Sequence, residues 1–147
     1  RCTEDSHCKG TIDIKNNIFY KDYRDDICII DHVYFLDDQR EHSESVMDNF
    51  YSDGNLFYTS KDPSCQDFSA SPDSTCDFEC WQDKGHDENS IYMSDPSFDS
   101  YNPYDKTFAN HNFTLSPSSP AIDAGVLIPG VNDNYKDTAP DIGAFEF

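Results

Sequence analysis

The sequence predicts an all-β chain whose short strands stack as the coils of a parallel β-helix, with one short helix and irregular loops. The motif Asn-(Ile/Leu)-Phe-Tyr occurs at 17–20 and again at 55–58, 38 residues later, a spacing within the 20–50 residue period of stacked repeats. The other apolar segments are short and are separated by irregular polar loops. No Asn-Gly or Asp-Gly hairpin turn lies between alternating strands, and Asp53-Gly54 comes closest. Two ordinary turn–strand junctions in an unrelated fold would also give this repeat.

The first half of the chain is expected to form three strand regions. Residues 11–20 place apolar side chains at every second position, which is typical of a strand. Residues 27–36 are β-branched and aromatic, which indicates one strand buried on both faces or two strands that meet at Asp31. Residues 37–49 are polar and acidic and are expected to form a loop or a surface helical turn. Residues 55–60 predict another short strand.

A short helix is expected after an irregular stretch rich in Pro, Ser and Asp. Ser74 or Thr75 is a suitable N-cap, and Phe78 and Trp81 would form the apolar face. Gly85 is a suitable C-terminal stop.

The second half of the chain is expected to be richer in turns. Residues 94–110 contain two X-Pro steps and predict turns, and residues 112–115 predict a short strand. The stretch 116–125 predicts a turn, a small apolar segment and a glycine. Residues 126–140 predict a loop, and residues 141–147 (DIGAFEF) predict a last strand.

Composition indicates one folded domain with an acidic surface. The chain has 147 residues, a formal net charge of −19, 11 Phe and 9 Tyr, so an aromatic core is available despite the low apolar content. This charge argues against nucleic acid and anionic membranes as partners, because no basic patch is present. No apolar run approaches the roughly 18 residues of a membrane span, so no membrane insertion is expected.

Cysteine usage favours an extracellular or cell-surface protein. The even number of cysteines allows up to three disulfides with unassigned pairing, and the candidates are Cys2, Cys8, Cys28, Cys65, Cys76 and Cys80. Cys76 and Cys80 would lie four residues apart on the expected helix, where a bridge fits badly. We therefore expect each to pair elsewhere, one of them with Cys65. Asn112-Phe113-Thr114 is the one N-glycosylation triplet, and together these features favour an oxidising compartment.

The repeated asparagines have a physical role in a stacked fold. Asn17 and Asn55 each precede an aromatic strand. Asparagine tolerates left-handed backbone angles at a tight corner, and its amide can hydrogen-bond to the coils on either side. We therefore expect Asn17 and Asn55 to lie at equivalent corners of neighbouring coils.

The last part of the chain resembles the closing segment of right-handed parallel β-helix proteins of the pectate-lyase-like superfamily. Residues 112–125 (NFTLSPSSPAIDAG) are similar to the Phe-x-Leu…Ser-Pro-Ala-Ile-Asp-x-Gly element of these proteins, and residues 141–147 to their Asp-Ile-Gly-Ala-Phe-Glu-aromatic ending. Residues 76–98 are similar to the helix and Asp-Pro-x-Phe loop that precede this element. The resemblance covers most of residues 11–147 and implies either a single β-helix domain over 1–147 or the C-terminal fragment of a longer one. A start at Arg1 without Met is compatible with processing or with such a fragment.

Residues 112–147 are accordingly expected to close one end of the stack. Small residues permit close packing there, apolar residues can plug the end, and Asp123 and Asp141 can cap backbone donors. The matching positions include Ala121, Ile122, Asp123, Ala124, Gly125, Asp141, Ile142, Gly143 and Phe145.

The resemblance implies polysaccharide lyase or hydrolase activity, but the residues do not single out a catalytic site. A lyase base would have to come from Lys15, Lys21, Arg24 or Arg40. Arg24 lies among aspartates and is better explained as a neutralised surface arginine. No pair of carboxylates is marked out for glycoside hydrolysis. Calcium is the one cofactor suggested, since pairs of acidic residues offer oxygen ligands, with Asp25, Asp26, Asp133 and Asp137 as candidates. Simple surface acids would look the same.

We therefore expect a non-catalytic extracellular β-helix module with a structural, surface or assembly role. Its expected partners are other protein chains or copies of itself at the N-terminal end, together with glycans. The alternative is the C-terminal part of a polysaccharide lyase or glycoside hydrolase, which rests on likeness of fold alone.

Overall fold

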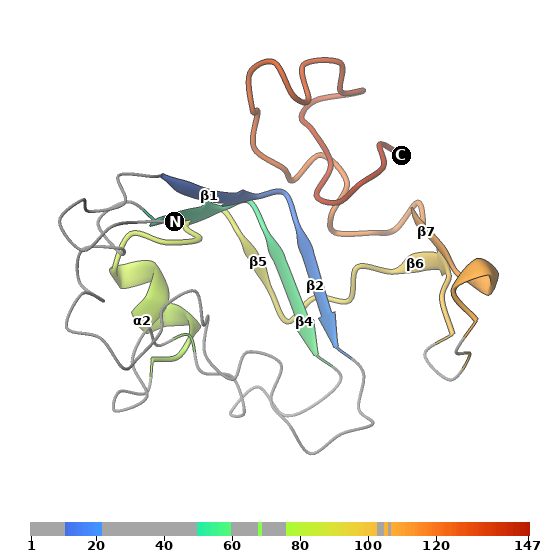
Figure 1. Ribbon diagram of the computed structural model, residues 1–147, viewed down its shortest axis with the longest axis horizontal. Coiled ribbons are helices and arrows are strands. Elements are labelled where there is room, and N and C mark those ends of the chain that lie inside the picture. Colours follow the sequence, from blue (N-terminus) through green and yellow to red (C-terminus); the bar gives the residue numbers. More distant parts are fainter. Residues whose placement is uncertain (1–10, 22–49, 60–67, 69–75, 103–104, 106) are drawn as a thin grey trace, which may run out of the picture.

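The computed structural model describes residues 11–21, 50–59, 68, 76–102, 105 and 107–147. These residues are mostly strands and turns with one short α-helix, so this part of the chain is all-β (Figure 1). The expected strand at 27–36 and loop at 37–49 lie outside the described residues. So do Ser74, Thr75, Asp25, Asp26 and four of the six cysteines.

Two parallel sheets begin the fold. Strand β1 (Ile12–Lys15) pairs in parallel with β3 (Phe50–Asp53). Strand β2 (Ile18–Lys21) pairs in parallel with β4 (Leu56–Thr59), which pairs in parallel with β5 (Ile91–Tyr92). The described strands form three small sheets and do not themselves close into complete coils.

The expected continuous strand over 11–20 is wrong, because the chain turns between β1 and β2. Asn16 has a φ of 56°, a left-handed conformation that asparagine tolerates better than most residues. The equivalent break between β3 and β4 is at Gly54, with a φ of 63°. The alternating apolar pattern therefore spans two strands, which are separated by a corner at Asn16.

The β2–β4–β5 sheet is covered on both faces (Figure 1). Phe19 and Phe57 stack on one face, with ring centroids 5.0 Å apart and planes 5° apart, and pack with Phe68 and the helix. On the other face, Ile18 and Leu56 pack against residues of the C-terminal segment, defined here as residues 116–147. Two separate apolar clusters thus share one sheet, since successive side chains of a strand point to opposite faces.

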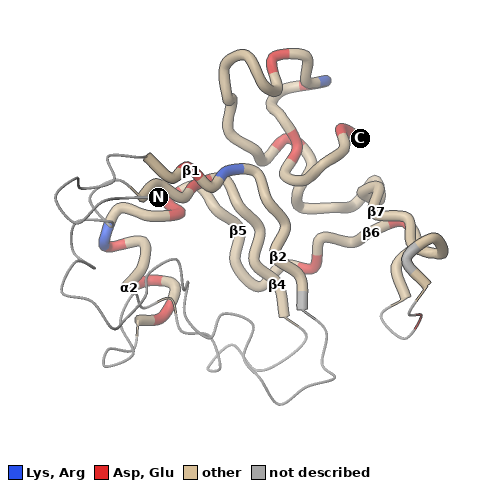
Figure 2. The backbone as a smooth tube through the Cα atoms, in the orientation of Figure 1, with Lys and Arg blue, Asp and Glu red and all other residues tan. Residues whose placement is uncertain are grey.

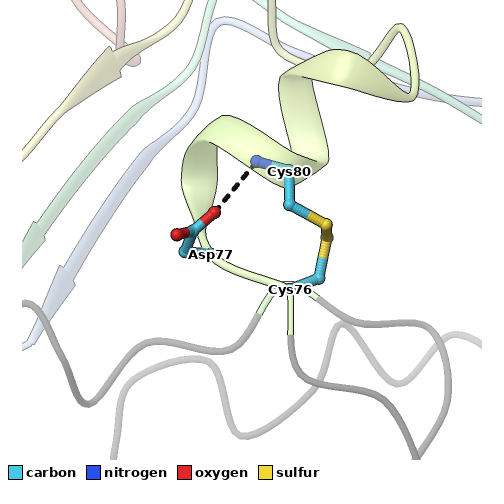
Figure 3. The surroundings of a disulfide bond; sticks show 3 residues. All are labelled: Cys76, Asp77 and Cys80. Atoms are coloured by element: carbon cyan, nitrogen blue, oxygen red, sulfur yellow. Dashed lines mark hydrogen bonds between the residues drawn. A yellow bond between two sulfur atoms is a disulfide. The ribbon is translucent and has the colours of Figure 1, made fainter.

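Helix α2 (Phe78–Asp83) begins later than the sequence predicts. Its N-cap is Asp77, whose carboxylate accepts a hydrogen bond from the Cys80 N–H at 2.9 Å (Figure 3). Gly85 follows the C-cap with a φ of 84°, and its N–H donates to the Gln82 carbonyl at 2.8 Å. Phe78 and Trp81 are the buried face of α2, as predicted.

Cys76 and Cys80 form a disulfide with each other, so the expectation that each pairs elsewhere is wrong (Figure 3). The expected poor geometry of a bridge applies only when both cysteines lie within the helix. Because α2 starts at Phe78, Cys76 lies before the N-cap and outside the helix, and the two Cα atoms are 5.3 Å apart. This separation is within the ordinary range for a disulfide.

Removing this bridge is expected to have a modest effect on stability. It closes a loop with a sequence separation of 4, and a loop that short restricts the unfolded chain by about 2 kcal/mol. The Cys76→Ser/Cys80→Ser double variant should therefore lose about 2 kcal/mol in urea unfolding while keeping its far-ultraviolet circular dichroism. A loss of the folded signal altogether would show that the bridge is essential for folding.

The third sheet is antiparallel. Strand β6 (Phe98–Ser100) pairs with β7 (Asn112–Leu115), and a single 3-10 turn, η2 (Phe108–Asn110), lies between them. Strand β7 matches the expected strand at 112–115, whereas β6 falls in the stretch 94–110, for which turns and no strand are expected. Phe98 contacts Tyr20 of β2 at a centroid distance of 6.0 Å, which brings this sheet beside β2.

The C-terminal segment consists of turns, so the expected last strand at 141–147 is wrong. Carboxylates take the place of a strand partner. The two Asp141 oxygens accept from the Asp123 N–H at 2.8 Å and the Phe147 N–H at 2.6 Å. Glu146 accepts from the Asp141 N–H at 3.2 Å. Ile142 and Ala121 are fully buried, but Phe145 is 56% exposed and does not plug the fold.

Gly125 is held where a larger residue does not fit. A Cβ there would lie 2.8 Å from the Pro140 carbonyl oxygen and 2.9 Å from that of Asp141, which are backbone atoms. Gly125→Ala is therefore expected to cost about 3 kcal/mol through overpacking, measured by urea unfolding. Gly130→Ala is the control, because it meets no atom within 4 Å and adds the strain of its positive φ alone. An equal cost for both variants would contradict the close packing at Gly125.

Candidate docking edge at the first strands

Equivalent corner residues of neighbouring strands are joined by side-chain hydrogen bonds. The Asn17 N–H donates to the Asn55 Oδ1 at 2.9 Å. The Asn55 N–H in turn donates to the Ser90 Oγ at 2.8 Å. Each corner N–H is thus accepted by the side chain of the corner residue one strand later, and together these bonds form a ladder.

The middle of the ladder is anchored in a buried polar cluster. Asn55 is 0% exposed, and its Nδ2 donates to the Ile14 carbonyl at 3.0 Å and to the Asp87 Oδ1 at 2.9 Å. The other Asp87 oxygen accepts from the Trp81 Nε1 at 2.8 Å. Ser90 also donates to Asp87, at 2.6 Å. These bonds compensate the burial of a carboxylate that is 1% exposed.

Sequence reasoning missed this cluster and the third copy of the corner motif. Ser90-Ile91-Tyr92 is in register with Asn55-Leu56-Phe57, but serine replaces the asparagine by which the motif was recognised. A search for any short hydrogen-bonding residue before an apolar–aromatic pair would have found Ser90.

Asn16 fixes the C-terminal segment to the first corner and was also missed. Its Nδ2 donates to the Val126 carbonyl, and its Oδ1 accepts from the Val126 N–H, each at 2.8 Å. The Asn16 carbonyl accepts from the Gly143 N–H at 2.9 Å. Residues more than a hundred positions apart therefore lie side by side, with Gly125 and Gly143 allowing the close approach.

Matched positions are less buried in the first strands than in the next. Ile12 is 36% exposed, whereas its partner in the register, Phe50, is 5% exposed. Phe19 is half-buried, whereas Phe57 is 5% exposed. Asn17 is exposed where Asn55 is fully buried. Among the described residues, β1 and β2 are edge strands whose neighbour on one side is missing.

A groove of about 390 Å³ lies over this edge, called here the β2 groove. Ile18 and Phe19 of β2 contribute to it, together with β6 and β7 on one side and the C-terminal segment on the other. Its lining residues are Asn16, Asn17, Ile18, Phe19, Phe98, Phe113, Leu115, Ile142, Gly143, Ala144 and Phe145. A second hollow of about 380 Å³ shares Asn16, Gly143, Ala144 and Phe145 with it and continues toward Val131 and Tyr135.

Most described carboxylates accept hydrogen bonds from other groups of the protein. Asp123 accepts from the Ala139 N–H at 3.0 Å and the Thr138 N–H at 2.9 Å, and these bonds hold the pKa of Asp123 below its usual value. Hydrogen bonds are also accepted by the carboxylates of Asp53, Asp77, Asp87, Asp95, Asp99, Asp105, Asp133, Asp141 and Glu146. Figure 2 shows acidic residues distributed over α2, the turns and the C-terminal segment.

The predicted calcium ligands Asp133 and Asp137 and the predicted glycosylation site Asn112 lie in the described part of the chain. Asp133 accepts from the Gly130 N–H at 2.8 Å, and Asp137 has a φ of 56°. Within the described ranges, no three His, Cys, Asp or Glu side chains are grouped as metal ligands. Asn112 is exposed on β7, and its Oδ1 accepts from the Thr114 hydroxyl at 2.7 Å. Cys2, Cys8, Cys28 and Cys65 lie outside the described residues.

His86 is a buried histidine on the α2 side of the fold. It is 9% exposed and stacks on Trp81 at a centroid distance of 4.3 Å, and its buried Nδ1 has no described hydrogen-bond partner. Burial lowers the pKa of His86 below 6.5, with Asp87 opposing and Lys84 adding to the shift. The unfolded chain therefore binds more protons below about pH 6.5. This contribution to stability is present above that pH and is lost as the pH falls toward the lowered pKa.

We expect the free energy of unfolding to fall between pH 7 and pH 5, and the fall to be smaller in His86→Phe. Phenylalanine keeps a ring against Trp81 but cannot bind a proton. Urea unfolding at several pH values measures this. An identical pH dependence in both proteins would assign the effect to other groups.

No family model, no characterised protein and no solved structure matches the chain. Within the part of the chain that the structure describes, no helix has the length and apolarity needed to cross a membrane.

Proposed function

We propose that this chain is the C-terminal section of a right-handed parallel β-helix and acts outside the cell as a non-catalytic structural module. In this proposal its N-terminal edge joins other protein chains or copies of itself. The observation that carries the proposal is the unequal burial of matched positions: Ile12 is exposed and Phe19 is half-buried, whereas their register partners Phe50 and Phe57 are buried. An apolar edge of this kind gains stability when another strand covers it.

Two further features support stacking along one direction. The strands of the first two sheets are parallel and in register, and the corner ladder links them. In the C-terminal segment, by contrast, the carboxylates of Asp123, Asp141 and Glu146 accept hydrogen bonds from several backbone N–H groups of the same segment. Growth of the stack is therefore proposed at β1 and β2, with residues 112–147 as the closing segment.

An extracellular or cell-surface location is part of the proposal. The Cys76–Cys80 disulfide fits an oxidising compartment. Asn112 is exposed and lies in a glycosylation triplet, so we propose it as the acceptor of a glycan.

The alternative, a section of a polysaccharide lyase or glycoside hydrolase, has weaker support. Catalysis by two carboxylates needs side chains that are free to face a sugar. Ten of the described carboxylates instead accept hydrogen bonds within the protein, mostly from backbone N–H groups. Calcium at Asp25, Asp26, Asp133 or Asp137 stays a prediction, to be checked by the shift in melting temperature on adding calcium.

A cross-linking experiment tests the proposed function. A photo-reactive amino acid replaces Ile12 at the edge in the secreted protein, and in a control it replaces Leu127, which is 52% exposed in the C-terminal segment. We expect adducts at position 12 whose peptides come from another copy or from one β-helix polypeptide, and none at position 127. Equal adducts at both positions, or release of sugar ends from polysaccharides by the purified chain, would contradict it.

A further inference from the structure

We propose that the β2 groove accepts one extended strand of a separate polypeptide, which adds in parallel to β2 and carries the same corner motif. The motif is a small polar residue followed by an apolar and then an aromatic residue. This inference rests on the proposed function and names the chemistry of the partner at the same edge.

The backbone of β2 is oriented for this addition. The Asn17 carbonyl accepts from the Leu56 N–H at 2.8 Å, so Asn17 faces β4. In β4, the Asn55 and Phe57 carbonyls face β5, where they accept from the Ile91 and Met93 N–H groups. Because alternate residues of a parallel strand bond to opposite sides, Leu56 faces back toward β2. Its register partner Ile18 therefore directs its N–H and carbonyl away from β4, toward the open side.

The corner predicts the next rung of the ladder. Asn55 Oδ1 accepts from the Asn17 N–H, and Ser90 Oγ accepts from the Asn55 N–H. By the same rule, Asn17 Oδ1 would accept the N–H of the incoming corner residue. No described residue donates to Asn17 Oδ1, and Asn17 is exposed. A small polar corner residue in the partner matches Asn17, Asn55 and Ser90.

The side chains of the edge favour an aromatic residue at one position. Phe19 stacks on Phe57 at 5.0 Å with nearly parallel rings, and Phe19 is also one of the residues that line the β2 groove. A ring opposite Phe19 would continue this stack. The neighbouring residue would face Ile18 and the wall formed by Leu115 and Ile142, which are apolar. An aromatic residue opposite Phe19 and an apolar residue opposite Ile18 are therefore expected in the partner.

A second copy is a poorer occupant than a separate strand. Parallel addition by a copy would have to use the far edge of its last parallel strand, β5, which has two residues, whereas β2 has four. Each copy also carries a net charge of −19, which opposes self-association at low salt.

The probe is a synthetic peptide with the sequence of residues 11–21, titrated into the folded chain and followed by amide shifts in nuclear magnetic resonance. We expect saturable binding, with protection of the Ile18 amide from hydrogen exchange. Replacing the peptide's Phe19 by Ala should weaken binding about tenfold, since one stacked aromatic contact is lost.

Two tryptophan variants of the chain locate the site. Ala144→Trp fills the β2 groove from an exposed position and should abolish binding. Leu127→Trp, outside the groove, should leave the affinity unchanged. Circular dichroism checks that both are folded.

The inference is overturned if the peptide does not bind, if Ala144→Trp binds as well as Leu127→Trp, or if the chain self-associates through the groove and excludes the peptide. It is also overturned if an N-terminally extended chain fills the groove with its own preceding strand. Self-association through the groove removes the separate strand but leaves the proposed assembly at the N-terminal edge standing, whereas a groove filled by the chain's own preceding strand removes both, so the two failures can be told apart.

Discussion

Replacing Asn55 by alanine is expected to lower the free energy of unfolding by about 4 kcal/mol. Asn55 is 0% exposed and lies at the middle of the corner ladder. Its removal leaves the Asn17 N–H without its acceptor at 2.9 Å and the Ile14 carbonyl without its donor at 3.0 Å. It also takes one donor from the buried Asp87. Each buried polar group left unpaired costs about 1–3 kcal/mol.

The measurement is urea unfolding followed by fluorescence. The chain has one tryptophan, Trp81, and its indole donates to the same Asp87 carboxylate that Asn55 contacts. Its emission therefore reports on the affected cluster. A loss of 4 kcal/mol is a large part of the total stability of an ordinary domain.

Asn17→Ala is the matched control, because Asn17 occupies the equivalent corner at the open edge. Its Nδ2 donates to the Lys15 carbonyl at 2.8 Å, but the side chain is exposed and water can replace that bond. We expect a loss of about 1 kcal/mol or less. If both variants lost a similar free energy of unfolding, burial of the corner residue would not explain the cost of replacing Asn55.

The repeat could be recognised in the sequence because both copies, 17–20 and 55–58, have the asparagine and the two aromatic residues at the same relative positions. Asn17 and Asn55 lie in register at equivalent corners, and β7 and the apolar face of α2 lie where the pattern places them. The short strand β4 also falls in its predicted region. These features depend on local side-chain patterns, which a single sequence records.

The features that could not be read depend on contacts between distant residues. The hydrogen bonds between the Asn16 side chain and the Val126 backbone join residues 110 positions apart. The final turns at 141–147 have the composition of a strand, but Asp141 and Glu146 take up the backbone donors that a neighbouring strand would use. The expectation for the disulfide is wrong because α2 begins two or three residues later than expected, which moves Cys76 out of the helix.

The docking edge was anticipated only in outline. An open N-terminal end followed from the resemblance, whereas the β2 groove is formed by β2, β6, β7 and the C-terminal segment together. No local pattern reports how four separate segments meet. The orientation of Ile18 also depends on which strand pairs with β2.

Replacing Trp81 by alanine is expected to be more damaging still, at about 5 kcal/mol. The side chain is 2% exposed and contacts Phe50, Phe68 and His86, with ring centroids 6.0, 6.3 and 4.3 Å away. Truncating a buried tryptophan removes its apolar contacts and leaves a cavity. It also removes the indole N–H that donates to Asp87 at 2.8 Å. Circular dichroism in urea is the measurement, since the fluorescent residue is lost.

Trp81→Phe separates the two contributions, because phenylalanine keeps much of the ring contact but cannot donate to Asp87. We expect it to cost about 2 kcal/mol, which is the range for leaving a buried carboxylate oxygen without one donor. In the Asn55→Ala background the same change should cost a different amount, since both residues donate to Asp87 and neighbouring changes are not additive. Strictly additive losses would mean that Asp87 does not couple the corner ladder to α2, and that the ladder and the helix are stabilised independently.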